Sequence, residues 1–109
     1  MKRTFAEIDY SMDTESMARF AKALGHPTRI KILKILASQQ FCFTGDLVDL
    51  LPLAQSTVSQ HLKELKDSGL IKGEIQPPKI KYCIDSDNWN KARMLFSGFF
   101  EDVLTNDKC

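Results

Sequence analysis

Two short helical segments joined by a tight turn constrain this chain more than any other feature. Thr44 is a suitable N-cap for a first helix from Gly45 to about Leu51. Pro52 ends that helix, because a proline pushes the preceding residue out of the helical region. A second helix is predicted only a few residues later, from about Gln55 to Ser68. Its apolar side chains fall at i, i+4 and i+7, and they are Val58, Leu62 and Leu65.

Two further helices are predicted upstream of this unit. Asp13 and Thr14 can cap a helix that runs to about Leu24, and Gly25 closes it. Its apolar stripe consists of Met17, Phe20, Ala21 and Leu24. Pro27 suits the first position of the next helix. The apolar residues of this second helix cover more than one face, so we expect it to be the buried centre of the domain.

After Gly69 the apolar pattern changes from a helical to a strand period. Residues 70–75 and 79–84 read as two strands, and Ile80, Tyr82 and Ile84 alternate with polar or smaller residues in the second. The stiff link Gln76–Pro77–Pro78 predicts a hairpin with a basic tip. Residues 41–43 predict a brief strand, and a last helix is expected from Asn88 to about Leu104. The predicted fold class is mainly α with a small β-hairpin.

Length and composition place the chain among single-domain globular proteins. Its 109 residues fit one domain, in which we interpret residues 1–11 as a flexible arm and 105–109 as a tail. No apolar run reaches the ~20 residues that span a bilayer, and the first nine residues lack a signal-peptide core. We therefore expect a cytoplasmic protein without a membrane partner. Three widely spaced cysteines (Cys42, Cys83, Cys109) are no disulfide framework and suit a reducing compartment.

The second helix of the central unit begins with small, polar side chains. A helix that enters the major groove, which is about 12 Å wide, needs such a face, because bulky apolar groups would block entry. Serine and threonine reach phosphates or base edges, and glutamine can bond adenine through two contacts. The backbone N–H groups around Gln55 to Thr57 add a partly positive helix end that faces phosphate. The alternative is an ordinary solvated face, but the turn, the caps and the hairpin together favour DNA binding.

The order of elements and two long motifs resemble one family of regulators. Residues 23–33 read ALGHPTRIKIL, residues 55–65 read QSTVSQHLKEL and residues 69–71 read GLI. These stretches look like the arsenic-repressor (ArsR/SmtB) family of winged helix-turn-helix repressors, over roughly residues 12 to 104. The resemblance implies a symmetric dimer in which the first and last helices pair. It also implies that the protein represses transcription by binding operator DNA, and that this repression is released when an inducer, often a metal ion, binds.

The resemblance also assigns residues to DNA contact. The matching DNA-reading positions are Gln55, Ser56, Thr57, Ser59, Gln60 and His61, with Lys63 and Lys66 along the same helix and Lys79 and Lys81 in the wing. Between residues 55 and 81, five lysines against Glu64, Asp67 and Glu74 leave a net charge of +2 per subunit. We therefore expect marked salt dependence of DNA binding. His61 itself is better interpreted as a phosphate or packing contact than as a metal ligand, and His26 as a cap or turn residue.

The last predicted helix is more apolar than one buried face requires. We infer that it packs on the first helix and on a second copy of the chain, since a monomer would leave much of it in water. The predicted dimer contacts are Met17, Phe20, Trp89, Leu95, Phe96, Phe99, Phe100 and Val103. The alternative is an ordinary core helix of a monomer.

A metal site is not expected. Metal-sensing relatives often carry a Cys-x-Cys pair near the short helix, whereas this chain has Cys42–Phe43–Thr44 there. A lone thiolate binds arsenite, zinc or cadmium weakly, because these want two to four good ligands. The default for Cys42 is a small buried apolar residue. A thiol- or metal-responsive sensor using Cys42, with help from Cys83 or Cys109, stays open as an alternative.

The sequence therefore predicts a sequence-specific, dimeric DNA-binding repressor with an unidentified inducer. A winged-helix module that binds protein rather than DNA is the second hypothesis, and the basic wing and the Ser/Thr/Gln-rich helix count against it. An enzyme using Cys42 and His61 as a thiol–base pair is a third. No cofactor motif accompanies that pair, so we expect neither enzymatic activity nor a cofactor.

Overall fold

The computed structural model describes residues 10–39 and 42–103, and these form five helices and three strands. In chain order the elements are α1 (Met12–Leu24), α2 (Pro27–Gln39), β1 (Cys42–Phe43), α3 (Thr44–Leu50), α4 (Gln55–Ser68), β2 (Ile71–Gln76), β3 (Lys79–Ile84) and α5 (Ser86–Val103). The expected tail, and all of the expected arm except its last two residues, lie outside the described residues. None of the described helices is long and apolar enough to cross a membrane.

The helix starts differ from the sequence-based prediction in which side chain satisfies the free amides. Ser11 caps α1, and its hydroxyl accepts a hydrogen bond from the Thr14 N–H at 3.1 Å. Thr44 was predicted as an N-cap but lies inside α3. The Asp46 carboxylate reaches back instead and accepts the N–H of Phe43 at 3.1 Å. Helices α1 and α3 therefore begin slightly earlier than predicted, at Met12 and Thr44.

The core forms where α1, α2, α3 and α4 meet the base of the sheet. The completely buried side chains are Phe20, Ile32, Leu47, Val58, Leu62, Leu65 and Leu70. The central position of α2 is confirmed, because Ile32, Leu33, Ile35 and Leu36 are all buried there. Phe20 was predicted at the dimer interface. It instead fills the core of its own subunit and has no exposed surface to offer a partner.

The hairpin belongs to a three-stranded antiparallel sheet with the order β1-β3-β2. Cys42 pairs with Tyr82, and the Ile71–Ile84 and Ile75–Ile80 pairs lie at the base and near the tip of the hairpin. Exposure rises along β2, from 2% at Ile71 to 75% at Ile75. The sheet is therefore anchored in the core at one end and open at the other. Residue 41, also predicted in the strand, lies outside the described part.

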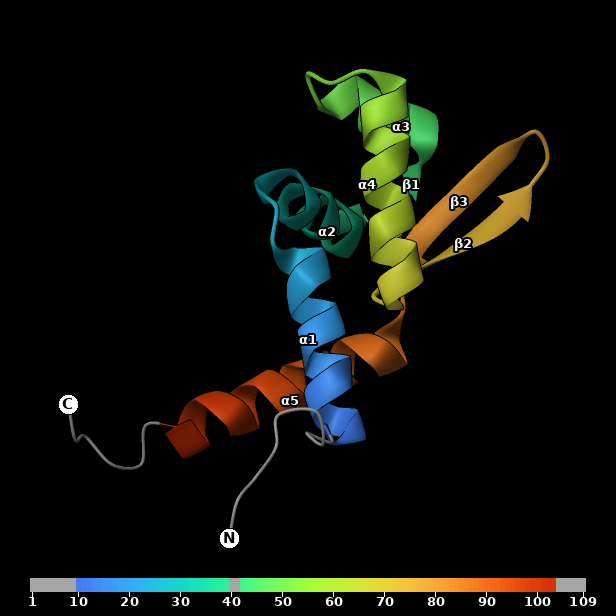
Figure 1. The fold of residues 1–109 in the computed structure, drawn as a ribbon. Helices are drawn as coiled ribbons and strands as arrows, with labels where there is room; N and C mark the ends of the chain where they lie inside the picture. The colour runs from blue at the N-terminus through green and yellow to red at the C-terminus, as the bar shows by residue number, and fades with distance from the viewer. Residues whose placement is uncertain (1–9, 40–41, 104–109) are drawn as a thin grey trace, which may run out of the picture.

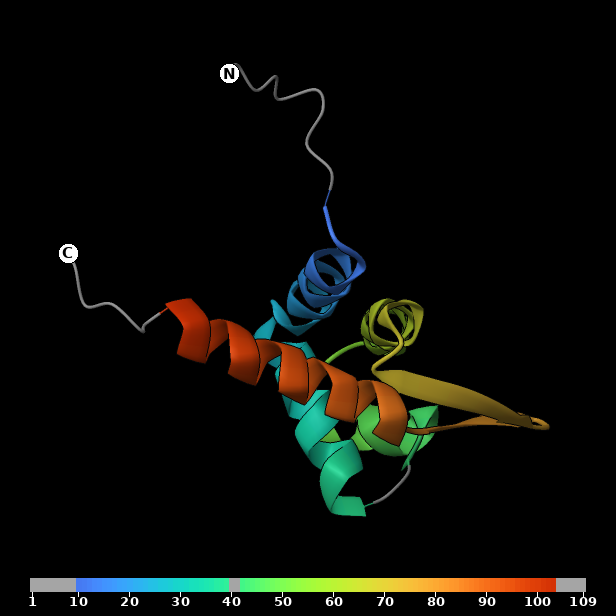
Figure 2. The ribbon, with the colours of Figure 1, turned by 90° about the horizontal axis from the view of Figure 1, so that it is seen from below.

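Figure 1 shows the hairpin as a wing that projects from the body beside α4, while α5 crosses the foot of α1. The view from below shows that the C-terminal half of α5 runs away from the wing (Figure 2).

Two side chains fasten the last turn of α4 to the helices below it. The Arg19 Nε of α1 donates to the Ser68 carbonyl at 3.2 Å, and the Asn88 Nδ2 of α5 donates to the Gly69 carbonyl at 2.9 Å. Gly69 itself adopts the left-handed conformation that closes α4, with φ of 91°.

Candidate DNA-binding surface

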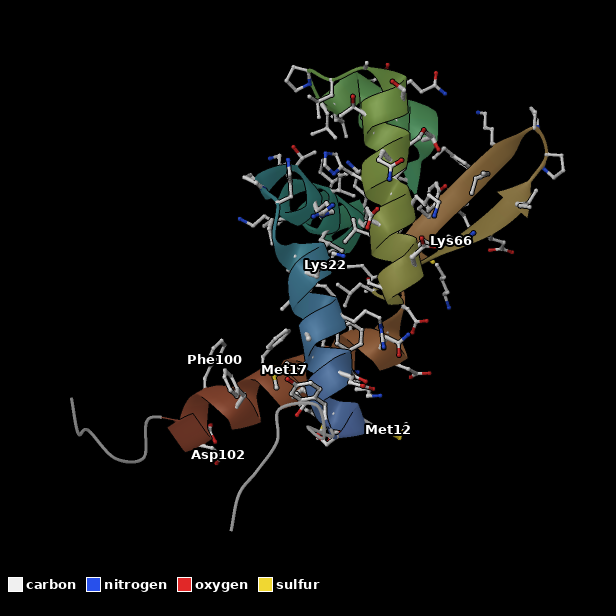
Figure 3. The ribbon with its side chains drawn as sticks, viewed as in Figure 1. Met12, Met17, Lys22, Lys66, Phe100 and Asp102 are labelled. Carbon is white, nitrogen blue, oxygen red and sulfur yellow. The ribbon has the colours of Figure 1, made fainter. Side chains whose placement is uncertain are left out.

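Helix α4 has one completely buried side and one exposed polar side. Its apolar residues Val58, Leu62 and Leu65 are 0% exposed and fix the helix on the core. The side chains on the outer side that the sequence assigned to DNA are exposed, namely Gln55, Ser56, Thr57, Ser59, Gln60, Lys63 and Lys66. The predicted helix bounds and face are both confirmed. Figure 3 shows Lys66 in the C-terminal half of this helix.

The N-terminus of α4 has no side-chain cap, so its first backbone N–H groups can bind an anion. The helix begins after Ala54, whose side chain makes no capping hydrogen bond, so its first amides depend on another acceptor. The carbonyl of Ala54 already accepts the N–H groups of Thr57 and Val58, both at 3.1 Å. Phosphate oxygen is a suitable acceptor for the amides that precede them.

Charged side chains along α4 and the wing are partly engaged within the subunit. The Lys63 ammonium lies 2.7 Å from the Asp67 carboxylate, and this hydrogen bond raises the pKa of Lys63. The Lys81 ammonium lies 3.3 Å from the Glu74 carboxylate. The Lys79 ammonium lies 5.2 Å from the centre of the Phe43 ring. Two of these lysines already lie beside carboxylates. The surface therefore attracts phosphate less strongly than the number of lysines suggests.

An open groove of about 520 Å³ separates α4 from the wing. Gln55 and Ser59 of α4 form one wall, and Lys79, Ile80 and Tyr82 of β3 form another. The start of α3 closes the end of the groove with Thr44, Gly45 and Asp46. The structure thus brings the predicted helix and wing residues to the same groove, with hydroxyl, amide and ammonium groups around it.

His61 differs from the other residues assigned to DNA. Its ring is half-buried and packs against the ring of His26, with 4.4 Å between the ring centres. The remaining assigned side chains of α4 are exposed to solvent. His61 therefore faces α2 as well as the outer surface.

Two uncharged polar side chains of the groove were not assigned to DNA contact from the sequence. They are Thr44 of α3 and Tyr82 of β3. The alternation of the hairpin could have indicated Tyr82, since it shares a face with Ile80. Thr44 was missed as a groove residue, because its hydroxyl was predicted to cap α3.

Cys42 lies in a closed environment. It is 1% exposed, and its thiol donates a hydrogen bond to the Gln39 side-chain carbonyl at 3.1 Å. Burial, with a smaller contribution from Asp46, raises the pKa of the Cys42 thiol. The reactive thiolate is therefore disfavoured. Within residues 10–39 and 42–103, no group of three His, Cys, Asp or Glu side chains is placed to hold a metal ion.

The opposite end of the molecule exposes apolar side chains. On α5, Met94 is 69% exposed, Phe99 46% and Phe100 60%. Trp89, Leu95 and Phe96 are half-buried and pack against the core, and Met17 of α1 is half-buried as well. The side chain of Val103 lies outside the described part. Phe100 is on the part of α5 that extends beyond α1 (Figure 3).

Comparisons with known proteins agree with this arrangement. The family described as "Bacterial regulatory protein, arsR family" matches residues 26–72, which run from the start of α2 to the start of the wing. The HTH-type transcriptional regulator YgaV of Escherichia coli is 34% identical over 76 residues, covering 70% of this chain and 77% of YgaV. This chain belongs to the ArsR family.

Other relatives and solved structures agree with this family and fold. The transcriptional repressor PagR of Bacillus anthracis is 34% identical over 80 residues, covering 73% of this chain and 79% of PagR. Its crystal structure superposes with a TM-score of 0.63 and covers 76% of this chain and 97% of PagR, at 29% identity. An ArsR-like regulator from Rhodococcus sp. RHA1, at 22% identity, shares the fold, with a TM-score of 0.71 and 85% of each chain covered.

Membership in the ArsR family confirms the predicted fold and the general function. The chain is a winged helix-turn-helix, DNA-binding transcriptional regulator and not an enzyme. In this ArsR-family fold, α3 and α4 form the helix-turn-helix and the β2–β3 hairpin forms the wing.

Proposed function

We propose that this protein is a homodimeric repressor that binds operator DNA in the cytoplasm and leaves it when an inducer binds. In this proposal α4 lies in the major groove, and the wing lies against the flanking backbone or minor groove. The family membership and the repressor PagR among the relatives support repression.

The observation that carries the proposal is the division of α4 into a buried and an exposed side. Because Val58, Leu62 and Leu65 are completely buried, the helix is held rigidly without using its outer face. That face is then exposed to base edges, although Gln60 must exchange its hydrogen bond to the Glu64 carboxylate, 3.2 Å long, for one to a base. We assign base contacts to Gln55, Ser56, Thr57, Ser59 and Gln60, of which the two glutamines can form paired hydrogen bonds to adenine.

The lysines contribute attraction that does not depend on sequence. We assign phosphate contacts to Lys63 and Lys66 on α4 and to Lys79 and Lys81 on the wing. Lys63 now pairs with Asp67, and Lys81 pairs with Glu74. To bind phosphate, each ammonium must leave its carboxylate or contact the carboxylate and the phosphate together. DNA binding should therefore weaken with salt, although less steeply than four unpaired lysines would give.

The exposed apolar surface of α5 supports the dimer. Phe99, Phe100 and Met94 leave more apolar surface in water than a stable monomer needs. Pairing of α5, with Met17 of α1 beside it, would bury this surface and place two copies of α4 on one side. Two-fold symmetry then matches two half-sites about one helical turn apart.

The test is DNA binding measured by fluorescence anisotropy, with a duplex from upstream of the protein's own gene. We expect Ser56→Ala and Gln60→Ala each to lose roughly 1–3 kcal/mol of binding free energy while the dimer stays intact. Asn90→Ala on α5 is the control, because Asn90 is exposed and belongs neither to α4 nor to the groove beside it. Unchanged binding by both α4 variants would show that this helix does not read the operator.

A further inference from the structure

His26 occupies the start of α2 and uses its ring to hold that helix end. Its Nδ1 accepts the N–H of Thr28 at 3.0 Å, and its carbonyl accepts the N–H of Ile30 at 3.1 Å. A ring nitrogen that accepts a hydrogen bond carries no proton, so the ring proton is on Nε2. Protonation of Nδ1 would break the bond to Thr28 and remove the cap.

His61 extends from α4 and lies against this ring. The ring centres are 4.4 Å apart, and the planes are tilted by 48°. The Nδ1 of His61 is buried and has no hydrogen-bond partner among the described residues. A proton placed there would be a buried donor without an acceptor, which is costly. The contact therefore requires the neutral form of His61, with its proton on Nε2.

The surrounding charges also oppose proton uptake by His61. Burial lowers the pKa of His61 below its ordinary value of 6.5, and His26 and Arg29 of α2 lower it further. Only Glu64, one turn along α4, acts in the opposite direction. On the side of α1, the charged groups near Glu64 are Arg19 and Lys22, which line a hollow with Glu64 and Asp67.

Arg29 links this cluster to α1. Its Nη2 donates to the Lys22 carbonyl at 3.4 Å, and its Nε is buried without a partner among the described residues. The Arg29 guanidinium lies close enough to His61 to oppose a positive charge there. A proton on His61 would therefore be repelled by Arg29.

We propose that His26 and His61 form a proton-sensitive contact that positions the recognition helix, so that acidification loosens α4 from α2 and weakens operator binding. The proposal rests on the proposed function for its effect on DNA. The contact itself is independent of that function. His61 acts here as a positioning residue rather than as a residue that reads bases.

The sign of the effect follows from linkage. A histidine whose pKa is lowered in the folded state binds fewer protons there than in the unfolded chain. Its contribution to stability is complete above the ordinary pKa of 6.5 and is lost as the pH falls toward the lowered value. The folded domain, and the α2–α4 contact within it, should therefore weaken below neutral pH.

The experiment measures thermal unfolding of the full chain without DNA at about pH 7.5 and about pH 5.5. His61→Phe keeps a ring in the contact and removes the nitrogens. We expect it to show about half the acid-induced fall in melting temperature of the wild type, or less. His26→Asn retains an acceptor for the Thr28 N–H and should also reduce the fall. His61→Gln replaces His61→Phe if that variant does not fold. An equal fall in wild type and variants would overturn the proposal.

Binding to the same upstream duplex completes the test. We expect the wild type to lose roughly fivefold in affinity on acidification, and His61→Phe to lose clearly less. Tighter binding of the wild type at low pH, abolished by His61→Phe, would show a direct phosphate contact by charged His61 and overturn the proposal. If no form bound this duplex even near neutral pH, the proposed function would fail, and the unfolding series would still decide whether the histidine contact exists.

Discussion

Helices α4 and α5 both carry apolar side chains at helical spacing, but they differ in how much of this apolar surface the subunit buries. In α4, Val58, Leu62 and Leu65 are all completely buried. In α5, Ala92 is 5% exposed, whereas Phe99 and Phe100 are 46% and 60% exposed. The apolar side of α4 is completely covered within one chain. Helix α5 has an apolar surface that the described residues leave exposed.

The difference separates two kinds of function on one small fold. A helix that reads DNA must present polar groups in a fixed position, so its anchoring has to be completed inside the subunit. A helix that joins two subunits must keep part of its apolar surface outside, since burying one large side chain stabilises by about 1.5–3 kcal/mol. Substitutions in the two helices should therefore change different measurable quantities.

Truncation of the anchoring side of α4 should have the largest effect. Leu62→Ala removes a completely buried side chain at the centre of the core and should lower the free energy of unfolding by about 2–5 kcal/mol. Chemical denaturation measures this loss. Gln60→Ala on the exposed side should stay within about 0.5 kcal/mol of the wild type. Comparable losses in both variants would contradict the division of α4 into two sides.

A charge on the exposed side of α5 should break the dimer without unfolding the subunit. Phe100→Glu should weaken self-association by about 2–4 kcal/mol, because a carboxylate would be placed in an apolar contact. Sedimentation velocity over a range of protein concentrations measures this. Gln60→Glu makes the same charge change on α4 and should leave the assembly intact. A wild-type protein that is monomeric at micromolar concentration would contradict the proposed dimer.

The contact between the end of α4 and Asn88 of α5 should be weakened by any side chain at residue 69. Gly69 has φ of 91°, and a Cβ there would lie 2.8 Å from the Asn88 Nδ2. Gly69→Ala should cost about 1–2 kcal/mol, through the left-handed backbone and the displaced Asn88. Gly98→Ala is the matched control, because a Cβ meets no atom within 4 Å there. It should stabilise α5 by roughly 0.5–1 kcal/mol in thermal unfolding.

The smallest effect should come from the ion pair on the outer side of α4. Asp67→Asn removes the partner of Lys63, lowers the pKa of Lys63 toward its ordinary value and frees the ammonium for phosphate. Stability should hardly change, since exposed ion pairs contribute little. The slope of log affinity against log salt should steepen by up to about one. An unchanged slope would show that Lys63 does not approach the DNA.

Much of this arrangement could be predicted from the sequence, because local rules decide it. The bounds of α4 follow from an uninterrupted apolar period and from Gly69, and the structure reproduces them. The N-cap positions Ser11 and Phe43 were missed, because several nearby residues can satisfy the same free amides. Only the folded backbone selects among Thr44, Asp46 and their neighbours.

The long-range placements were harder to predict than the local ones. Phe20 lies in the same apolar stripe as Met17, and periodicity alone does not distinguish core from interface. His26 and His61 are 35 positions apart, so nothing in the chain indicates that their rings meet. The assignments of individual side chains to DNA contacts remain predictions, which the α4 variants test.

The hydrogen bonds from Arg19 to Ser68 and from Asn88 to Gly69 make the last turn of α4 a pivot. Both donors come from α1 and α5, the helices proposed to form the dimer. The 14 residues of α4 form a lever roughly 20 Å long from this pivot to Gln55. A tilt of about 10° there would move the far end by roughly 3–4 Å, close to the spacing of one base pair. A slight change in how two subunits meet would then be enough to take the helix out of register with its site.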